Sequence, residues 1–230
     1  MTVTLYELAG ADPALRFSPY CWRTRLVLAH KGIDVEGLPW RFTEKARIAF
    51  SGGTRVPVLV DGERVVTDSW HIAEYLDEAY PDALVLPRDA AGRGHMLFIN
   101  AWADGVLHGA IARCVLKDIH DLLAPEDQAY FRESRERAMG RSLEAVVSDR
   151  DTAGVTGVRA ALAPVRAVLR RQMWLGGEAP DYADYLLLGS LQWARCVSRF
   201  ALLAEDDPVA AWHHRGLALF GGLLENAPRA

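Results

Sequence analysis

Cysteine is scarce in this sequence: three residues, Cys21, Cys114 and Cys196, are spread over 230 positions. An odd, sparse set cannot form a disulfide framework, and no pair of these cysteines has the spacing of metal ligands. The sequence therefore predicts neither a disulfide-stabilised scaffold nor a metal site. We expect the three thiols to remain reduced, as they would in the cytoplasm.

Net charge and long hydrophobic runs are also lacking. There are 26 basic and 30 acidic residues, a formal net charge of −4, so there is no basic field to hold nucleic acid or a membrane surface. The apolar runs are well short of the roughly 18 residues that span a bilayer. The first residues lack the basic and apolar regions of an export signal. We therefore expect a cytoplasmic protein with no nucleic-acid or membrane partner.

Residues 1–80 predict a small mixed sheet with flanking helices. The expected elements are a strand, a helix, a second strand, a hairpin and a second helix, over residues 3–8, 19–31, 33–38, 56–66 and 69–80. A helix between the first two strands implies a parallel pair. Asp61-Gly62, inside the Val- and Leu-rich hairpin, suits a type I′ turn. This order is typical of a thioredoxin-like α/β domain (βαβ-ββα).

The rest of the chain predicts helices alone. Residues 81–88 contain Pro81 and Pro87 and no periodicity, so we expect a linker there, followed by an all-helical domain over residues 89–230. The helical segments are expected at residues 90–123, 126–149, 158–172, 181–203 and 208–225. The segment 181–203 is apolar around most of its circumference, which is typical of a central, buried helix.

Ser18 and Pro19 stand where the first strand gives way to the first helix. Serine followed by proline is a common helix start, so Ser18 could be a cap and nothing more. The same hydroxyl, at the positive end of a helix, could instead donate a hydrogen bond to a thiolate. Cys21, three residues further on, is either an activated thiol or a packing residue.

Two further sequence motifs carry a structural and a functional interpretation. Val56-Pro57 precedes the hairpin. A cis bond there would turn the Val56 backbone outward to pair with a peptide, whereas a trans proline would only open a strand. Asp68-Ser69 begins the next helix and could be only its cap. Alternatively, the pair binds an amino acid: Asp68 binds the ammonium group, and the Ser69 hydroxyl and the first-turn N–H groups bind the carboxylate.

Taken together, these motifs resemble the cytosolic glutathione transferase superfamily. Phe17-Ser18-Pro19, Val-Pro-Val-Leu from Val56, and Asp-Ser-x-x-Ile-x-x-Tyr-Leu from Asp68 look like its N-terminal motifs. The stretch from Phe17 through Arg25 is most similar to serine-type members, the bacterial glutathione-dependent β-etherases and related fungal transferases. In the helical part, residues 181–184 (Asp-Tyr-Ala-Asp) resemble the superfamily's capping motif, with aspartate in place of serine or threonine.

The resemblance implies a role for each of these residues. Ser18 would polarise the glutathione sulfur, and Val56 would pair with the cysteinyl unit beside a cis Pro57. Asp68 and Ser69 would hold the γ-glutamyl end. Arg41 and Lys45 would hold the glycine carboxylate, unless they are solvated loop charges.

The function implied is that of a detoxifying glutathione transferase, which needs glutathione as co-substrate and no metal. The thiolate would attack an apolar electrophile, and the helical domain would supply the second substrate's pocket. Trp102, His108 and Tyr130 fall on the helices that would line it, unless these side chains pack in the core. A homodimer is implied as well. Three alternatives stay open: β-etherase cleavage of aryl ethers, thiol-disulfide or deglutathionylation chemistry through Cys21, and a non-catalytic binding module.

Overall fold

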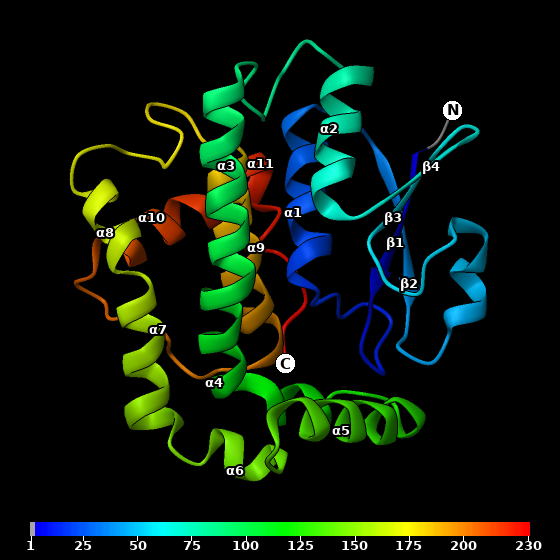
Figure 1. The fold of residues 1–230 in the computed structure, drawn as a ribbon, viewed down its shortest axis with the longest axis vertical. Coiled ribbons are helices and arrows are strands. Elements are labelled where there is room, and N and C mark those ends of the chain that lie inside the picture. The colour runs from blue at the N-terminus through cyan, green and yellow to red at the C-terminus, as the bar shows by residue number, and fades with distance from the viewer. Residues whose placement is uncertain (1–2) are drawn as a thin grey trace.

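The computed structural model describes residues 3–230 and contains a mixed sheet joined to a helical domain (Figure 1). The sheet has the strand order β2-β1-β3-β4. Strand β1 runs parallel to β2 and antiparallel to β3, and β3 runs antiparallel to β4. This confirms the expected thioredoxin-like topology. The elements are β1 (Val3–Leu8), α1 (Pro19–His30), β2 (Val35–Trp40), the 3₁₀ helix η1 (Lys45–Ser51), β3 (Val58–Asp61), β4 (Arg64–Thr67) and α2 (Ser69–Ala79).

The hairpin turn differs from the predicted type I′ turn at Asp61-Gly62. Asp61 pairs with Arg64, so the two-residue loop is Gly62 and Glu63. Of these, Gly62 alone has a positive φ, at 59°, which is the arrangement of a type II′ turn. Asp61 belongs to the strand instead, and its carboxylate accepts hydrogen bonds from the hydroxyls of Tyr75 and Tyr80 at 2.9 and 2.6 Å.

The second strand begins later than the predicted residue 33. Helix α1 ends at His30 and is followed by Gly32, whose φ is 65°, and the Ile33 N–H then donates back to the Leu28 carbonyl at 3.0 Å. This hydrogen bond caps the C-terminus of α1 and occupies the Ile33 N–H, which a strand beginning at residue 33 would have needed for pairing.

The second part of the chain is all helical, as expected, but its helices are more broken than the sequence pattern predicts. Helix α5 ends before Gly140, which has a φ of 65°, and Ser142 caps the next helix. Pro164 separates α7 from α8. The helices are α3 (Ala90–Trp102), the π-helical turn η2 (Ala103–Leu107), α4 (His108–Asp121), α5 (Pro125–Met139), α6 (Leu143–Val147), the π-helical turn η3 (Arg150–Gly154), α7 (Val155–Ala161), α8 (Ala163–Leu169), α9 (Tyr182–Val197), α10 (Pro208–Leu217) and α11 (Leu219–Gly222).

Helix α9 is the central helix, and its N-terminus is fixed by the expected capping motif. The Asp181 carboxylate accepts from the Ala183 N–H at 2.8 Å, and the Asp184 carboxylate accepts from the Asp181 N–H at 3.2 Å. Asp184 is fully buried. It also accepts from two backbone N–H groups and from the Trp212 indole. The substitution of serine or threonine by Asp181 therefore preserves the cap.

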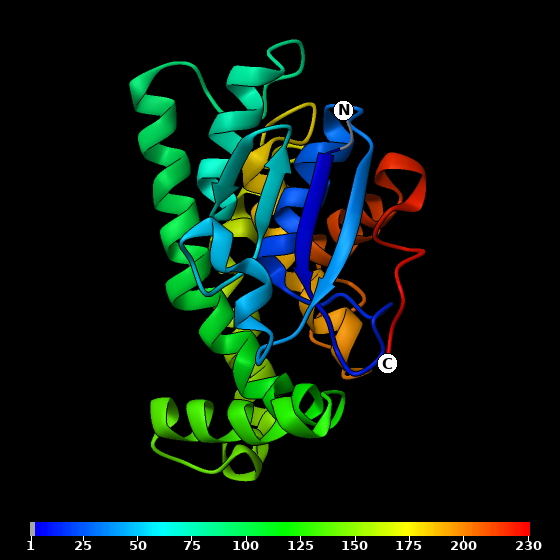
Figure 2. The ribbon, with the colours of Figure 1, turned by 90° about the vertical axis from the view of Figure 1, so that its right-hand side faces the viewer.

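Helix α1 lies between the sheet and α9 (Figures 1 and 2). The approach is close at Gly189 of α9, where a Cβ atom would lie 2.7 Å from the Pro19 carbonyl oxygen. Only glycine fits at that distance. The first turn of α1, which follows Ser18, is thereby held against the helical domain.

The segment between the sheet and the helical domain, residues 81–88, contains no helix or strand. No helix within residues 3–230 is long and apolar enough to cross a membrane.

Candidate active site

A cavity of about 520 Å³ lies between the sheet domain and the helical domain. Its walls come from the start of α1, the loop before β3, the segment after β2, and helices α4, α5 and α9. Most of its lining is apolar or aromatic, and its polar lining groups are few, which is typical of a small-molecule site. Among the expected functional residues, Ser18, Val56, His108 and Tyr130 line it, together with Tyr20, Phe42, Arg55, Phe131, Arg135 and Trp193.

Ser18 caps α1 and lines the cavity at the same time. Its Oγ accepts from the Cys21 N–H at 3.4 Å, which is a long hydrogen bond, and the side chain is almost fully buried. Within residues 3–230 the hydroxyl proton of Ser18 has no oxygen or nitrogen acceptor, and the Cys21 sulfur beside it is only a weak acceptor. The cap uses only the oxygen lone pair, so the O–H remains able to donate to a group in the cavity. The two interpretations of Ser18 are therefore compatible.

Val56 presents an unpaired backbone beside a cis peptide bond. The Val56-Pro57 bond is cis. Pairing of β3 with its neighbours begins only at Val58. Neither the N–H nor the carbonyl of Val56 has a hydrogen-bond partner in the part of the chain that is described. Because Val56 also lines the cavity, these groups are in place to pair with an extended peptide.

Asp68 lies at the start of α2 in an unusual backbone conformation. Its φ is 72°, and its carboxylate accepts from the N–H groups of Trp70 and His71 at 2.8 and 3.3 Å. A non-glycine residue with positive φ costs energy, and such residues cluster at binding sites. The Asp68 side chain is 57% exposed, so the carboxylate has lone pairs free for a ligand. Ser69 is buried, and its carbonyl accepts from the Tyr182 hydroxyl at 3.0 Å.

Arg41 and Lys45 do not line the cavity. Arg55 does, although it was not among the site residues expected from the sequence. Arg41 forms an ion pair with Glu44 at 3.4 Å. Lys45 places its Nζ 4.8 Å from the centre of the Tyr130 ring. Arg55 is exposed and has no ion pair or hydrogen bond within residues 3–230. A basic residue directly before Val-Pro was the local signal that could have identified it.

Cys21 is buried and does not line the cavity. Burial, with the nearby Glu7 charge, raises the pKa of the Cys21 thiol to about 12 and outweighs the lowering by the Ser18 hydrogen bond. A thiol with such a pKa stays protonated and unreactive near neutral pH. The geometry therefore favours packing over redox chemistry for Cys21. Cys114 and Cys196 are also buried and unpaired.

A polar network behind the cavity connects α1 to the helical domain. Arg23, fully buried, donates to Asp104 Oδ1 at 2.7 Å and to Asn100 Oδ1 at 3.3 Å. Its Nη2 lies 3.2 Å from Nε2 of His108, which also lies 2.9 Å from the Ser190 hydroxyl. Burial and the Arg23 charge lower the pKa of His108 to about 3. The ring is therefore neutral. Its Nε2 can accept from Arg23 or donate to the Ser190 oxygen, whose own proton goes to the Leu186 carbonyl at 2.7 Å, but it cannot do both.

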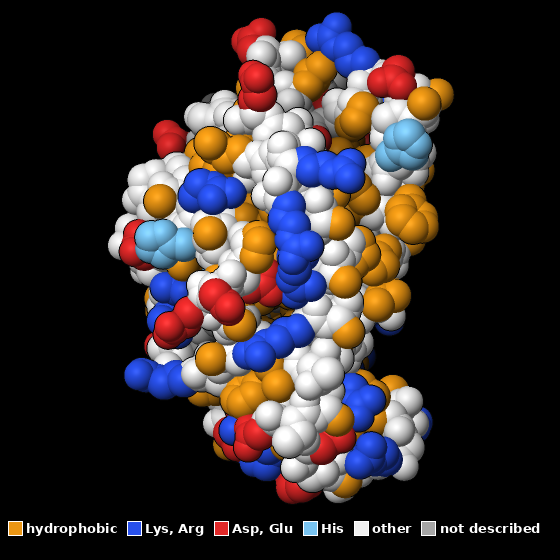
Figure 3. Space-filling view, turned by 90° about the vertical axis from the view of Figure 1, so that its left-hand side faces the viewer, with side chains coloured by type: hydrophobic (Ala, Val, Ile, Leu, Met, Phe, Trp, Pro, Cys, Tyr) orange, Lys and Arg blue, Asp and Glu red, His pale blue; other side chains and the backbone are white. Residues whose placement is uncertain are grey.

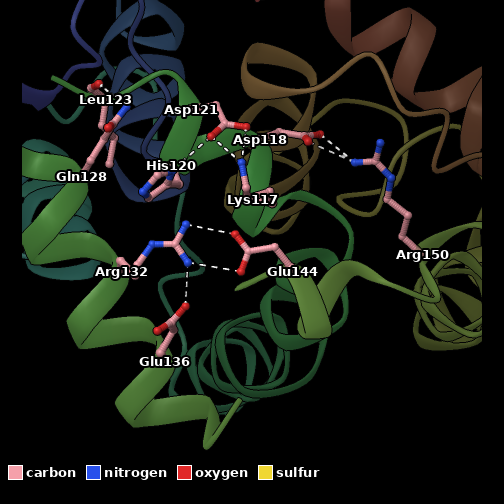
Figure 4. Close-up of polar contacts among 10 residues, drawn as sticks. All are labelled: Lys117, Asp118, His120, Asp121, Leu123, Gln128, Arg132, Glu136, Glu144 and Arg150. Atoms are coloured by element: carbon pink, nitrogen blue, oxygen red, sulfur yellow. Dashed lines mark hydrogen bonds and ion pairs between the residues drawn. The ribbon is translucent and has the colours of Figure 1, made fainter. Parts of the chain in front are cut away.

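Helix α5 forms the far wall of the cavity and is fixed from outside by ion pairs (Figure 4). Arg132 donates to Glu136 at 2.8 Å and to Glu144 of α6 at 3.0 and 3.2 Å. Tyr130, Phe131 and Arg135 of the same helix line the cavity. Trp102, expected at this pocket, does not line it. Within residues 3–230, no group of three or more histidine, cysteine or acidic side chains could hold a metal ion.

Comparison with known proteins gives two matching family models. The glutathione S-transferase N-terminal domain model matches residues 17–79, and the C-terminal domain model matches residues 95–217, more than half of the chain. The chain is similar to "Glutathione S-transferase Z1" of Arabidopsis thaliana, with 44% identity over 29% of this chain. It is also similar to a zeta-class glutathione S-transferase of Euphorbia esula, with 31% identity over 46% of this chain. The chain spans 33% and 50% of the lengths of these two relatives.

The fold is similar to a solved glutathione S-transferase of Ceriporiopsis subvermispora in complex with glutathione. The TM-score is 0.81, with 24% identity and full coverage of both chains.

Proposed function

The chain belongs to the glutathione S-transferase family, and we propose that it is a serine-type enzyme of that family. In this proposal the Ser18 hydroxyl holds glutathione as its thiolate, and the thiolate attacks an apolar electrophile. One observation carries the proposal: Ser18 lies at the cavity wall, at the N-terminus of α1, and its hydroxyl proton has no oxygen or nitrogen acceptor within residues 3–230. A hydroxyl donor and the positive end of a helix both stabilise an anion.

Each part of the tripeptide has a partner of suitable chemistry. The unpaired N–H and carbonyl of Val56 are placed to pair with the cysteinyl unit. The exposed carboxylate of Asp68, with Ser69 at the start of α2, is assigned to the γ-glutamyl end. Arg55, adjacent to Val56, suits the glycine carboxylate better than Arg41 or Lys45, because Arg55 lines the cavity and has no ion pair or hydrogen bond within residues 3–230.

The reaction is a nucleophilic displacement or addition. Glutathione has an ordinary thiol pKa near 8.5, so at neutral pH only a few per cent is thiolate in water. The hydrogen bond from Ser18 increases that fraction. In both reactions, the thiol proton leaves to solvent and a carbon–sulfur bond forms. In a displacement a leaving group then departs from the electrophile, and in an addition the adjacent carbon takes up a proton from solvent. The protein supplies positioning and electrostatic stabilisation.

Turnover with a reactive aryl halide tests this function. The protein is expected to bind glutathione in a calorimetric titration and to form the thioether from glutathione and 1-chloro-2,4-dinitrobenzene faster than the uncatalysed reaction. Glutathione binding without any turnover would support a binding module instead. Absence of binding at millimolar glutathione would contradict the proposal.

A second candidate is glutathione-dependent cleavage of aryl ethers, and the aromatic lining of the cavity favours it. Phe17, Trp40, Phe42, Tyr130 and Phe131 all face the space beside Ser18, and aromatic rings pack well against one another. The same thiolate would attack the ether-bearing carbon and release a phenolate. An assay with an aryl ether in place of the aryl halide separates the two reactions.

Asp68→Asn should weaken glutathione binding by about tenfold, because a charge-assisted bond to the ammonium becomes a neutral one. Asparagine still accepts the N–H groups that cap α2, so folding is preserved. Calorimetry with glutathione measures the loss. Asp89→Asn is the matched control, because Asp89 caps α3 in the same way and is exposed. Equal affinities of the Asp68 variant and the unmodified protein would remove Asp68 from the site.

A homodimer is part of the proposal, and exposed apolar side chains support it. Hydrophobic side chains gather at the right-hand margin of Figure 3, which faces the side of the molecule away from the sheet. Four exposed apolar side chains lie on η1, β4 and α3, elements toward the left of Figure 2. They are Phe50 of η1, Val65 of β4, and Leu97 and Phe98 of α3, of which Phe98 is 73% exposed. A group of this kind is characteristic of an interaction surface.

Phe98→Asp should therefore convert the dimer to a monomer, because a charge would be buried in the interface. Light scattering after size-exclusion chromatography measures the mass. Met173→Asp is the control, since Met173 is 57% exposed but lies outside η1, β4 and α3, between α8 and α9. A Phe98 variant with the mass of the unmodified protein would contradict an interface at α3.

A further inference from the structure

Arg135 of α5 is a cation in the wall of the cavity without an acidic partner. Its guanidinium carbon lies 4.8 Å from the centre of the Phe131 ring and 5.7 Å from that of Phe42. The guanidinium makes one hydrogen bond within residues 3–230, to the Ser134 hydroxyl at 3.2 Å. Arg135 can donate five hydrogen bonds, so most of its donors have no protein acceptor.

The other arginines near Arg135 on the same helix are paired. Arg132 binds Glu136 and Glu144, and Arg137 binds Glu133 at 2.5 Å while its side chain is 76% exposed. Helix α5 therefore carries two arginines with carboxylate partners, Arg132 and Arg137, and a third, Arg135, that faces the cavity.

The surroundings of Arg135 lack negative charge. None of the residues that line the cavity is acidic, and Arg55 contributes a second cation to the same lining. Burial and the Arg55 charge lower the pKa of Arg135, although arginine remains protonated at neutral pH. A half-buried cation among aromatic rings, with a second cation nearby, is best compensated by an anion that enters the cavity.

The aromatic rings and Arg135 are held together by the fold. Phe42 comes from the segment after β2, and its ring packs on Phe131 with 5.7 Å between centroids. The adjacent Thr43 N–H donates to the buried carboxylate of Asp127 on α5 at 2.9 Å. The sheet domain is thus tied to α5 at Asp127, two helical turns before Arg135, so the recognition surface is preformed.

We propose that the second substrate is an aromatic carboxylate, whose ring lies among the aromatic side chains of the cavity and whose carboxylate is bound by Arg135. This rests on the proposed function in that the carbon attacked by the thiolate belongs to this compound. With a halogen as leaving group, the carbon–sulfur bond forms, the carbon–halogen bond breaks, and halide leaves. The thiol proton goes to solvent.

Glutathione itself offers a competing carboxylate, at its glycine end. Arg55 is adjacent to Val56, which we assign to the neighbouring cysteinyl unit, whereas Arg135 belongs to the helical domain on the opposite wall. Arg55 is therefore assigned to glutathione and Arg135 to the second substrate. Loss of the Arg55 side chain should therefore weaken glutathione binding, whereas loss of the Arg135 side chain should weaken binding of the second substrate.

Binding of a matched pair of probes tests the proposal without any need for catalysis. Naphthalene-2-carboxylate and naphthalene-2-carboxamide have nearly the same shape and differ in charge. Quenching of tryptophan fluorescence can follow them, because Trp40 and Trp193 line the cavity. The full-length protein should bind the carboxylate about tenfold or more tightly than the amide, as expected of a charge-assisted hydrogen bond.

Arg135→Gln should abolish this preference, Arg135→Lys should retain part of it, and glutathione affinity should be unchanged in both. Arg137→Gln is the matched control and should keep the preference. Equal affinities of the two probes for the unmodified protein would overturn the proposal. So would an Arg135→Gln variant that loses glutathione binding while still preferring the carboxylate.

Kinetics with a matched pair of electrophiles completes the test. For 4-chloro-3-nitrobenzoate, Arg135→Gln should raise KM about tenfold or more with little change in kcat, because it removes an interaction made equally in the ground and transition states. For 4-chloro-3-nitrobenzamide, KM should stay the same. Equal effects on both electrophiles would show a merely structural role. If neither is turned over by the unmodified protein, turnover of 1-chloro-2,4-dinitrobenzene still decides the proposed function, and the probe binding decides the role of Arg135.

Discussion

Replacing Ser18 by alanine is expected to lower kcat/KM for glutathione conjugation by about 10- to 100-fold, the loss of one charge-assisted hydrogen bond to the thiolate. The pKa of enzyme-bound glutathione should rise toward its value in water, because the variant lacks the hydroxyl donor. Glutathione affinity should change little, since the peptide contacts remain. The ultraviolet absorbance of the thiolate, titrated against pH in the complex, measures the pKa.

Cys21→Ser is the matched control for Ser18→Ala. Cys21 is in the first turn of the same helix but is buried outside the cavity lining, so its substitution should leave the pKa of bound glutathione and the conjugation rate unchanged. The opposite pattern, with activity lost in the Cys21 variant and kept in the Ser18 variant, would favour thiol-disulfide chemistry. A thiolate titration that is the same in the Ser18 variant would remove Ser18 from catalysis.

Asp184→Ala should lower the free energy of unfolding by about 3–5 kcal/mol, the cost of breaking a buried, charged hydrogen-bond network. The Asp184 carboxylate accepts from the backbone N–H groups of Leu175, Gly176 and Asp181, and from the indole of Trp212 at 2.7 Å. All four donors would lose their acceptor. Urea denaturation followed by circular dichroism measures the change in midpoint.

Asp181→Ala is the matched control for Asp184→Ala. It removes only the bonds of the helix cap, accepted from the backbone N–H groups of Ala183 and Asp184, so a loss of about 1 kcal/mol is expected. Burial and the adjacent Asp184 charge raise the pKa of Asp181 to about 6, and the substitution also relieves that repulsion. Equal destabilisation by both substitutions would contradict the role given to Asp184.

The fold was predictable where local pattern and tertiary structure agree. Strands and helices of the sheet domain follow from periodicity, and the Asp181 cap follows from residue type. The hairpin turn was predicted wrongly because the Asp61 carboxylate is bound by Tyr75 of α2 and by Tyr80, which directly follows that helix, a contact that no local pattern reveals. The late start of β2 has the same kind of cause, since the cap of α1 uses Ile33.

The site was predictable only in part, for a related reason. Ser18 and Val56 belong to short motifs, and the structure places both at the cavity. Arg135 has no motif, because its role depends on the rings that two domains bring beside it and on the absence of an acidic partner. The exclusion of Cys21 likewise required its burial to be known, since a thiol in a first helical turn is activated or inert depending on solvent access.

A crystal structure of the protein with bound glutathione gives the decisive distance. We expect the sulfur atom to lie within about 3.5 Å of Ser18 Oγ, the range of a hydrogen bond that involves sulfur, with the cysteinyl backbone paired to Val56. Glutathione bound with its sulfur against any other side chain, or bound outside the cavity, would contradict the assignment of Ser18 as the group that holds the thiolate.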